Sequence, residues 1–139
     1  MIAICKLSRS SELPDHQRGR FTDFDDDYAV TPGRHYAVAG VGVWETILQF
    51  LVQDDDGLPS WCPAGLFELQ PQPVPVGWLC ALGDGISAHG RELWTRWTMR
   101  CGYPELIEDE RHSDRLIERD PVALAVFERE IGRLSDPAL

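Results

Sequence analysis

The residues of this chain that could do chemistry are its four cysteines, its four histidines and two runs of aspartate. Zinc ligands usually occur as close pairs of Cys or His along a chain. Here Cys5, Cys62, Cys80 and Cys101 are widely separated, and each histidine also stands alone. A site built from distant segments, such as Cys80 with His89 and Cys101, is the one zinc alternative left. We therefore expect no metal and no cofactor, and we expect the four cysteines to be reduced thiols in the core.

The aspartate runs at 25–27 and 54–56 do not fit a calcium loop. An EF-hand loop that began at Asp54 would need glycine at its sixth position and glutamate at its twelfth. Those positions hold Pro59 and Gly65. We therefore expect these carboxylates to lie in solvated turns, where they are also available to bind a partner.

Patterns of nucleophilic catalysis are weak. No Gly-x-Ser-x-Gly motif occurs in the sequence, and Gly40-x-Gly42 lacks the third glycine of a dinucleotide-binding loop. Cys62 and His35 could form a thiolate pair only if the strands that carry them align. The acids between 105 and 110 lie on a segment that predicts a solvated helix. These observations favour a binding protein over an enzyme.

The charge of the chain restricts its partners. The 139 residues include 13 Lys and Arg against 23 Asp and Glu, which gives a formal net charge of −10. Such a charge repels phosphate backbones and attracts basic proteins, so we expect no nucleic-acid partner. No apolar run reaches the roughly 18 residues of a membrane span, and the N-terminus lacks a signal-peptide pattern. We expect no membrane contact and a cytoplasmic location.

The segment Thr31–Leu69 predicts most of a small β-structure. Turn signals at Glu45-Thr46 and at Asp54–Gly57 separate apolar runs, and Asp-Gly is a typical hairpin sequence. The strands expected here are 34–43, 46–53, 58–62 and 67–69. A first strand is expected at Ile2–Leu7, and a long loop covers 8–27. Gly77–Leu82 could form one more strand that pairs with Ile2–Leu7, or else the start of a helix.

The end of this segment resembles the closing section of SH3-like barrels. In that family a strand ends at a proline, one tight helical turn follows, and a last short strand seals the barrel. Pro63, Ala64–Leu66 and Phe67–Leu69 match these three parts in order. More loosely, Gly-Arg-His-Tyr-x-Val followed by an acidic hairpin and Trp-x-Pro-x-x-Leu-Phe-Glu is similar to small bacterial SH3-like proteins of the toxin–immunity type. The aromatic strand with which SH3 domains bind proline-rich peptides is absent before Val30, so that activity is not implied.

The C-terminal part predicts helices after a proline-rich linker at 70–76. The spacing of apolar residues predicts one helix over 88–101. The charged segment 105–119 predicts two short helices with a break between them near Ser113. The sequence Asp120-Pro121 is a strong helix start. It precedes an apolar stripe with helical spacing, formed by Leu124, Phe127, Ile131 and Leu134.

Together these elements predict a single α+β domain over residues 1–139. An SH3-like small β-barrel with a linker strand occupies 1–82, and a helical part at 83–139 packs on it. One alternative function follows from this arrangement: a small enzyme or ligand-binding protein with a pocket between barrel and helices, lined by Trp78, Trp94 and Trp97. Another is a subunit of a permanent complex, which would expose a large apolar patch.

The leading hypothesis is an acidic protein-binding module. Its charge and the SH3-like resemblance favour an immunity protein that neutralises a cognate bacterial toxin, a basic protein whose cleft the carboxylates would occupy. Tryptophans beside acidic turns are typical of a binding surface. The contact residues expected at this surface are Trp44, Asp54, Asp55, Asp56 and Trp61. An alternative acidic surface is formed by Glu105, Glu108, Asp109 and Glu110.

Overall fold

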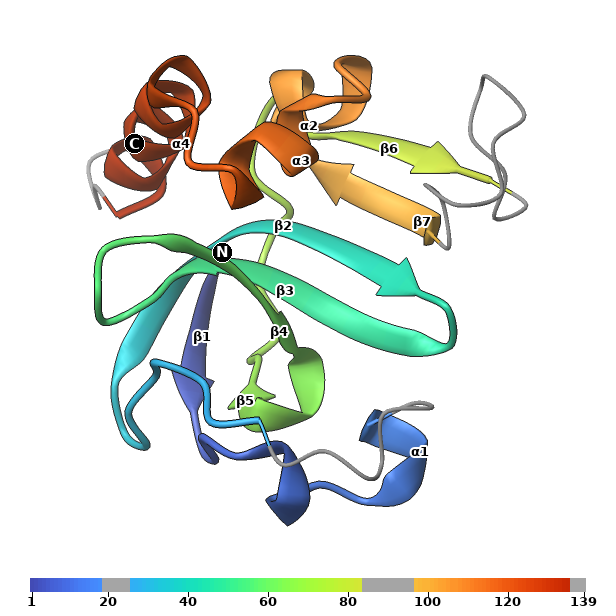
Figure 1. The fold of residues 1–139 in the computed structure, drawn as a ribbon, viewed down its shortest axis with the longest axis vertical. Helices are drawn as coiled ribbons and strands as arrows, with labels where there is room; N and C mark the ends of the chain where they lie inside the picture. The colour runs from blue at the N-terminus through green and yellow to red at the C-terminus, as the bar shows by residue number, and fades with distance from the viewer. Residues whose placement is uncertain (19–25, 84–96, 136–139) are drawn as a thin grey trace.

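The computed structural model describes residues 1–18, 26–83 and 97–135 as a mixed α+β structure. In Figure 1 strands β2 and β3 run through the middle, the three C-terminal helices lie on one side of them, and β1, β5 and α1 lie on the other. The strands are β1 (Ile2–Cys5), β2 (His35–Trp44), β3 (Ile47–Gln53), β4 (Pro59–Pro63), β5 (Phe67–Glu68), β6 (Leu79–Leu82) and β7 (Trp97–Gly102). The helices are α1 (Asp15–Arg18), α2 (Pro104–Glu108), α3 (His112–Ile117) and α4 (Pro121–Ser135), with single 3-10 turns at Ser10–Glu12 and Ala64–Leu66.

The seven strands form one antiparallel sheet. Its main path runs β4-β3-β2-β1-β5, while β7 pairs with both β2 and β6. In the described part of the chain the pairing does not join β4 to β5, so the sheet is open. The mixed α+β class is confirmed, whereas the expected closed SH3-like barrel is not.

The hairpins form where the turn signals predicted them. Glu45 adopts a positive φ of 56° between β2 and β3, and Gly57 adopts a φ of 79° in the turn between β3 and β4. A left-handed backbone at one turn residue lets the chain reverse within a few residues. The proline that ends β4, the 3-10 turn after it and the short strand β5 also occur as expected, and β5 pairs with β1.

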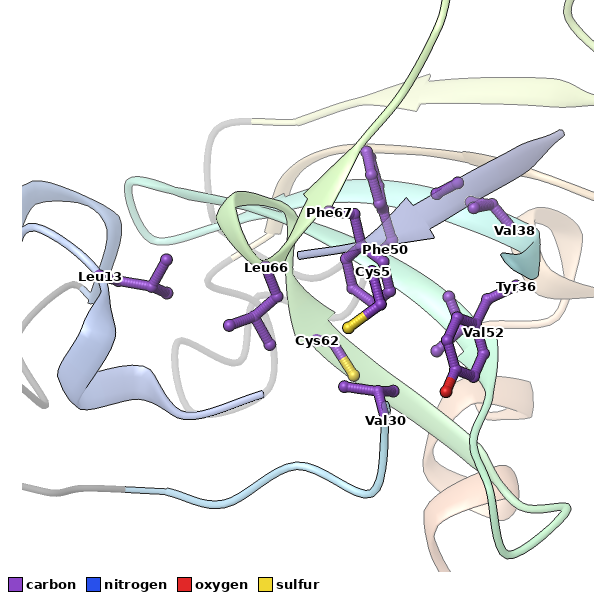
Figure 2. Packing of buried hydrophobic residues seen from close by; sticks show 11 residues of the cluster. Cys5, Leu13, Val30, Tyr36, Val38, Phe50, Val52, Cys62, Leu66 and Phe67 are labelled. Atoms are coloured by element: carbon purple, nitrogen blue, oxygen red, sulfur yellow. The ribbon is translucent and has the colours of Figure 1, made fainter. Parts of the chain in front are cut away.

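The strand β2 separates two hydrophobic cores. Val38 lies in the first core, while Ala37 and Ala39 face the second, because alternate residues of a strand point to opposite sides. A β-bulge between Val38 and Gly40 shifts the register of β2 against β3. Figure 2 shows the first core, which fills the space between β1, the start of β2, β3, β4 and β5. Its buried residues are Ala3, Cys5, Leu13, Val30, Tyr36, Val38, Phe50, Val52, Cys62, Leu66 and Phe67.

The second core lies between the other face of the sheet and helices α2, α3 and α4. Its buried residues are Ala39, Leu51, Tyr103, Leu106, Leu116, Ala123, Phe127 and Ile131. The predicted stripe of α4 is confirmed, because Phe127 and Ile131 are buried in this core while Leu124 and Leu134 pack against it. The predicted start of α4 is also confirmed: a side-chain oxygen of Asp120 accepts the Ala123 N–H at 3.0 Å.

A buried polar contact joins the residue before α2 to α3 beside this core. The hydroxyl of Tyr103 and the Nε2 atom of His112 are 2.6 Å apart, and both side chains are buried. Burial lowers the pKa of His112, because charging the imidazole in this site costs solvation. A neutral imidazole can pair with the hydroxyl in either tautomer, so the contact satisfies two polar groups that would otherwise be costly to bury.

Glycines allow close packing along β2 and β7. Gly40 and Gly102 are direct partners across the two strands, and a Cβ atom on either would lie 2.6 Å from the Cδ2 atom of Leu106 on α2. Two residues further along β2, a Cβ atom on Gly42 would lie 2.5 Å from the ring of Trp97. The absence of these side chains lets α2 and the Trp97 ring rest directly on the sheet.

Two expectations for the second half of the chain are wrong. Residues 97–102 form strand β7 rather than the end of a helix over 88–101, and the earlier part of that helix lies outside the described residues. Trp97, Met99 and Cys101 alternate along the chain, so the same residues also fit a strand, and pairing with the end of β2 decides between the two. The strand expected at 77–82 is confirmed as β6, but its partner is β7 instead of β1.

The expectation of four reduced thiols is also wrong. Cys5 and Cys62 are free and buried, whereas Cys80 and Cys101 form a disulfide. These two cysteines are direct partners across β6 and β7, which brings together residues 21 apart in sequence. The sequence could not indicate the pair because the hairpin that aligns them was not predicted.

The proline-rich linker at 70–76 is fixed at both ends. The side chain of Gln72 accepts the Ile2 N–H at 2.8 Å and donates to the Ile2 carbonyl at 3.0 Å, as a neighbouring strand would. Arg133 on α4 donates to the Val76 carbonyl at 3.2 Å. In the loop at 8–27, the described residues add a 3-10 turn and α1, which the sequence did not predict.

No described helix is long and apolar enough to cross a membrane.

The glycine contacts predict opposite effects of two alanine substitutions. Gly42→Ala should destabilise the protein by about 1–3 kcal/mol, because the new methyl group overlaps the Trp97 ring. Gly132→Ala, in α4, meets no atom within 4 Å and should stabilise the protein by about 1 kcal/mol through helix propensity. Urea unfolding measures both free energies. Equal effects of the two substitutions would contradict the close packing of Trp97 on β2.

Candidate functional site

The acidic turn between β3 and β4 is built by its first aspartate. One side-chain oxygen of Asp54 accepts the N–H groups of Asp56 at 2.9 Å and of Leu58 at 3.0 Å. The Asp54 carbonyl also accepts the Gly57 N–H at 3.0 Å. Asp54 therefore closes the turn, and the exposed Asp56 projects its charge from it.

The second aspartate holds the turn to the loop that precedes β2. The Asp55 carboxylate accepts hydrogen bonds from the hydroxyl groups of Tyr36 at 2.6 Å and of Thr31 at 2.7 Å, and it pairs with Arg34 at 2.9 Å. Its backbone N–H donates to the Ala29 carbonyl at 2.7 Å. Three donors converge on one carboxylate, so Asp55 acts as a structural clamp between segments that are distant in sequence.

This clamp shifts the pKa values of both partners. The hydrogen bond from Tyr36, followed by the one from Thr31, lowers the pKa of Asp55 below its ordinary value, and Arg34 contributes in the same direction. Burial, followed by the hydrogen bond to Asp55, raises the pKa of Tyr36. The pair therefore stays as a carboxylate and a neutral phenol around neutral pH.

Trp44 and Trp61, the two tryptophans predicted at the site, both contact the ring of Trp97. The ring centroids of Trp44 and Trp97 are 5.3 Å apart with their planes at 69°, and those of Trp61 and Trp97 are 4.6 Å apart. Trp61 is also oriented by α3, since its indole N–H donates to the Ser113 hydroxyl at 3.1 Å. The side chains come from β2, β4 and β7 on the face of the sheet that carries the helices.

An arginine that the sequence did not single out completes this aromatic cluster. The guanidinium carbon of Arg100 lies 4.6 Å from the centroid of the Trp97 ring and 5.9 Å from that of Trp61. Burial lowers the pKa of Arg100 to about 10, although the charge of Asp114 opposes the shift. Its Nε atom is buried and has no hydrogen-bond partner among the described residues. We call Trp44, Trp61, Trp97 and Arg100 the aromatic cluster.

Trp44 and the acidic turn lie at opposite ends of β3, whereas Trp61 pairs with Leu51, two residues before the end of β3 that leads into the turn. Trp44 pairs with Ile47 at the first residue of this strand, while the turn follows Gln53 at its last. The seven residues of β3 span roughly 20 Å. The structure thus brings Trp44 and Trp61 into one cluster but does not place the carboxylates of Asp54, Asp55 and Asp56 against it.

The alternative acidic surface is partly neutralised by neighbouring arginines. Glu105 pairs with Arg129 of α4 at 2.7 Å, and Asp109 pairs with Arg115 at 3.4 Å. The hydrogen bond from Arg129 lowers the pKa of Glu105. The remaining two acids, Glu108 and Glu110, are exposed at the end of α2 and in the segment after it.

The alternative hypothesis expected a pocket between barrel and helices, lined by three tryptophans. The two of these that the structure describes lie in separate parts of it. Trp78 packs against the first core, whereas Trp97 belongs to the aromatic cluster on the helical side of the sheet. Trp94 lies outside the described residues. The structure therefore does not bring Trp78 and Trp97 together.

Cysteine chemistry at Cys62 is not favoured either. Its thiol is buried, and burial raises its pKa to about 11, which disfavours the reactive thiolate. The hydrogen-bonding partner of this thiol is Ser60, while His35 is exposed on β2. Over the ranges 1–18, 26–83 and 97–135, no group of three or more His, Cys, Asp or Glu residues could hold a metal ion.

The comparisons with known proteins add no relative. No protein-family model matches the chain, and searches of curated proteins and of solved structures also found no match. The class that the fold defines is thus a mixed α+β protein with an open seven-stranded antiparallel sheet and C-terminal helices.

The Asp55 clamp predicts a specific loss of stability on substitution. Asp55→Asn should destabilise the protein by about 1–2 kcal/mol at neutral pH, because an amide cannot accept all three charge-assisted bonds. The matched variant Asp56→Asn changes the same charge at an exposed neighbour and should alter stability by less than about 0.5 kcal/mol. Chemical unfolding at neutral pH compares the two.

The pH dependence of unfolding provides a second test of the clamp. Since the folded pKa of Asp55 is depressed, its contribution is present above the unfolded pKa of about 4 and is lost as pH falls through the folded pKa. Asp55→Asn should therefore lose less stability than the wild type between neutral and acid pH, whereas Asp56→Asn should follow the wild type. Parallel curves for Asp55→Asn and the wild type would rule out the clamp.

Proposed function

We propose that this chain is an acidic protein-binding module of the immunity type, which neutralises a bacterial toxin by covering a basic surface. The observation that carries the proposal is the net charge of −10 on a chain of 139 residues. A basic substrate-binding cleft would be attracted to this charge over several ångströms, and carboxylates would occupy the positions of substrate phosphates.

Two aspartate runs contribute to one acidic surface. The hydrogen bond from Asp55 to the Ala29 carbonyl brings the loop that contains the exposed Asp26 and Asp27 beside the acidic turn. Asp26 also helps to raise the pKa of the neighbouring Tyr28 to about 12, although burial is the larger cause. We call Asp26, Asp27, Asp54 and Asp56 the acidic surface.

A single partner could contact both the acidic surface and the aromatic cluster. A typical interface buries about 800 Å² on each side, which corresponds to a patch about 30 Å across. This exceeds the roughly 20 Å length of β3 that separates Trp44 from the acidic turn, and Trp61 lies nearer to that turn. Tryptophan and arginine are frequent energetic anchors, while surrounding charges mainly accelerate and select the encounter.

We also propose that the first half of the chain is an SH3-like barrel. The supporting features are the pairing of β1 with both β2 and β5 and the 3-10 turn that follows Pro63. The antiparallel path β4-β3-β2-β1-β5 is the order that such a barrel would need before its ends meet.

The function can be tested through the neighbouring gene. If the adjacent open reading frame encodes a toxin, its expression in a bacterial host should stop growth, and co-expression of this chain should restore it. Binding of the two purified proteins should weaken as salt rises. An absence of rescue, together with no basic protein retained from the native host at low salt, would overturn the proposal.

Pairs of variants that remove the same number of charges locate the surface. Asp27→Asn with Asp56→Asn should slow association with the toxin about tenfold at low salt, because steering charges are lost at the acidic surface. The matched control, Glu118→Gln with Glu128→Gln, removes the same charge from exposed positions on the helical side and should change association less than twofold. If Glu108→Gln with Glu110→Gln has the larger effect instead, the contact surface is the end of α2.

A further inference from the structure

Strand β6 is weakly integrated into the protein. All four of its residues, Leu79 to Leu82, are exposed, and none of them belongs to either hydrophobic core. Its backbone pairs with β7, and the Gly83 N–H extends this pairing with a 3.0 Å bond to the Thr98 carbonyl. Burial of its own side chains therefore contributes little to holding β6. The strand also lies beside α2, and Trp78 directly before it packs on the first core. The covalent attachment of β6 is the disulfide between Cys80 and Cys101.

The two sulfur atoms of this disulfide have unequal surroundings. Cys80 is an exposed residue on the outer strand, whereas Cys101 is half-buried on β7 and its Sγ atom lies 3.4 Å from the Sδ atom of Met99. An incoming thiolate must approach along the axis of the S–S bond, and access at Cys80 is not blocked by a neighbouring strand in the described part of the sheet.

The other two thiols of the chain are unable to attack this disulfide in the folded state. Cys5 and Cys62 are fully buried in the first core, and burial raises the pKa of each. In the sheet, Cys101 is opposite Val41, which is opposite Phe50, which is opposite Cys62. Three strand spacings of about 4.8 Å therefore separate the backbone of Cys62 from that of Cys101.

We propose that the Cys80–Cys101 disulfide is a thiol–disulfide exchange site for external thiols, and that its reduction releases strand β6 from β7. The co-reactant is a cellular dithiol or monothiol, attacking at Cys80.

The chemistry balances without another oxidant. A thiolate of the reductant attacks Cys80 Sγ, the S–S bond breaks, and Cys101 leaves as a thiolate that takes a proton from solvent. The second thiol of a dithiol then attacks the mixed disulfide and releases Cys80 as a thiol. The reductant becomes a disulfide, and the protein gains two electrons and two protons.

Reduction should loosen β6 because it removes the cross-link that closes a 21-residue separation. The strand would then be held by backbone pairing with β7 and by its contact with α2, at the edge of a sheet and without a buried side chain of its own. Local opening of such an edge is expected to precede opening of the cores. The outer edge of β7 would become exposed whenever β6 detaches.

Hydrogen exchange on the full chain tests the release. After treatment with a dithiol under native conditions, the mass should rise by the two hydrogens of the cleaved disulfide, and amide exchange in peptides that cover 79–82 should accelerate at least tenfold. Exchange in β3 should change less than twofold, because its residues Leu51 and Val52 are buried. The double variant Cys80→Ser with Cys101→Ser should resemble the reduced protein with or without the dithiol.

The site of attack is tested with single variants and glutathione disulfide. Cys101→Ser leaves Cys80 as the accessible thiol, and Cys80→Ser leaves Cys101. The thiol at Cys80 should be modified at least tenfold faster. The proposal is overturned if the disulfide resists dithiols until the protein unfolds, if exchange at 79–82 is unchanged on reduction, or if the two single variants react at the same rate.

Discussion

The structure depends on the double role of β2. This ten-residue strand pairs with β3 along one edge, while β1 and then β7 share the other edge. It also has a hydrophobic core on each face, because successive residues of a strand point to opposite sides: Val38 lies in the first core and Ala39 in the second. Each core is therefore built against the same backbone, and the close approach of Leu106 at Gly40 couples the helices to the strand that also closes the first core.

Local signals in the sequence were sufficient to predict the strands β2 to β5. The turns at Glu45 and Gly57 and the proline at the end of β4 act within a few residues, so the strands between them were predictable. The hairpin of β6 and β7 was not, because Trp97 and Cys101 fit both a helical and a strand period and only pairing with β2 decides between them. The disulfide was missed for the same reason, since its two cysteines meet only in that hairpin.

The candidate site was predictable only in part. Trp44 and Trp61 were recognised from their types, but the residues that join them, Trp97 and Arg100, lie on the strand that was predicted as a helix. Asp55 was expected to project into solvent with its neighbours. Its role as a clamp depends on Thr31 and Tyr36, and a contact over 24 or 19 residues of sequence leaves no local pattern. Charge composition can thus suggest the kind of partner. It cannot distinguish a carboxylate that contacts a partner from one that is hydrogen-bonded within the fold.

The segment at 70–76 connects the two halves of the chain, and its proline content alone would suggest a stiff spacer. Gln72 attaches it to the start of β1, which β5 does not pair with, through both backbone polar groups of Ile2. Arg133 attaches its other end to α4. The side chain of Gln72 thereby covers hydrogen-bonding groups of the N-terminal strand that could otherwise recruit a strand from another molecule. The linker is therefore bonded both to a strand of the first core and to a helix of the second. It also protects the first strand against edge-to-edge association with another molecule.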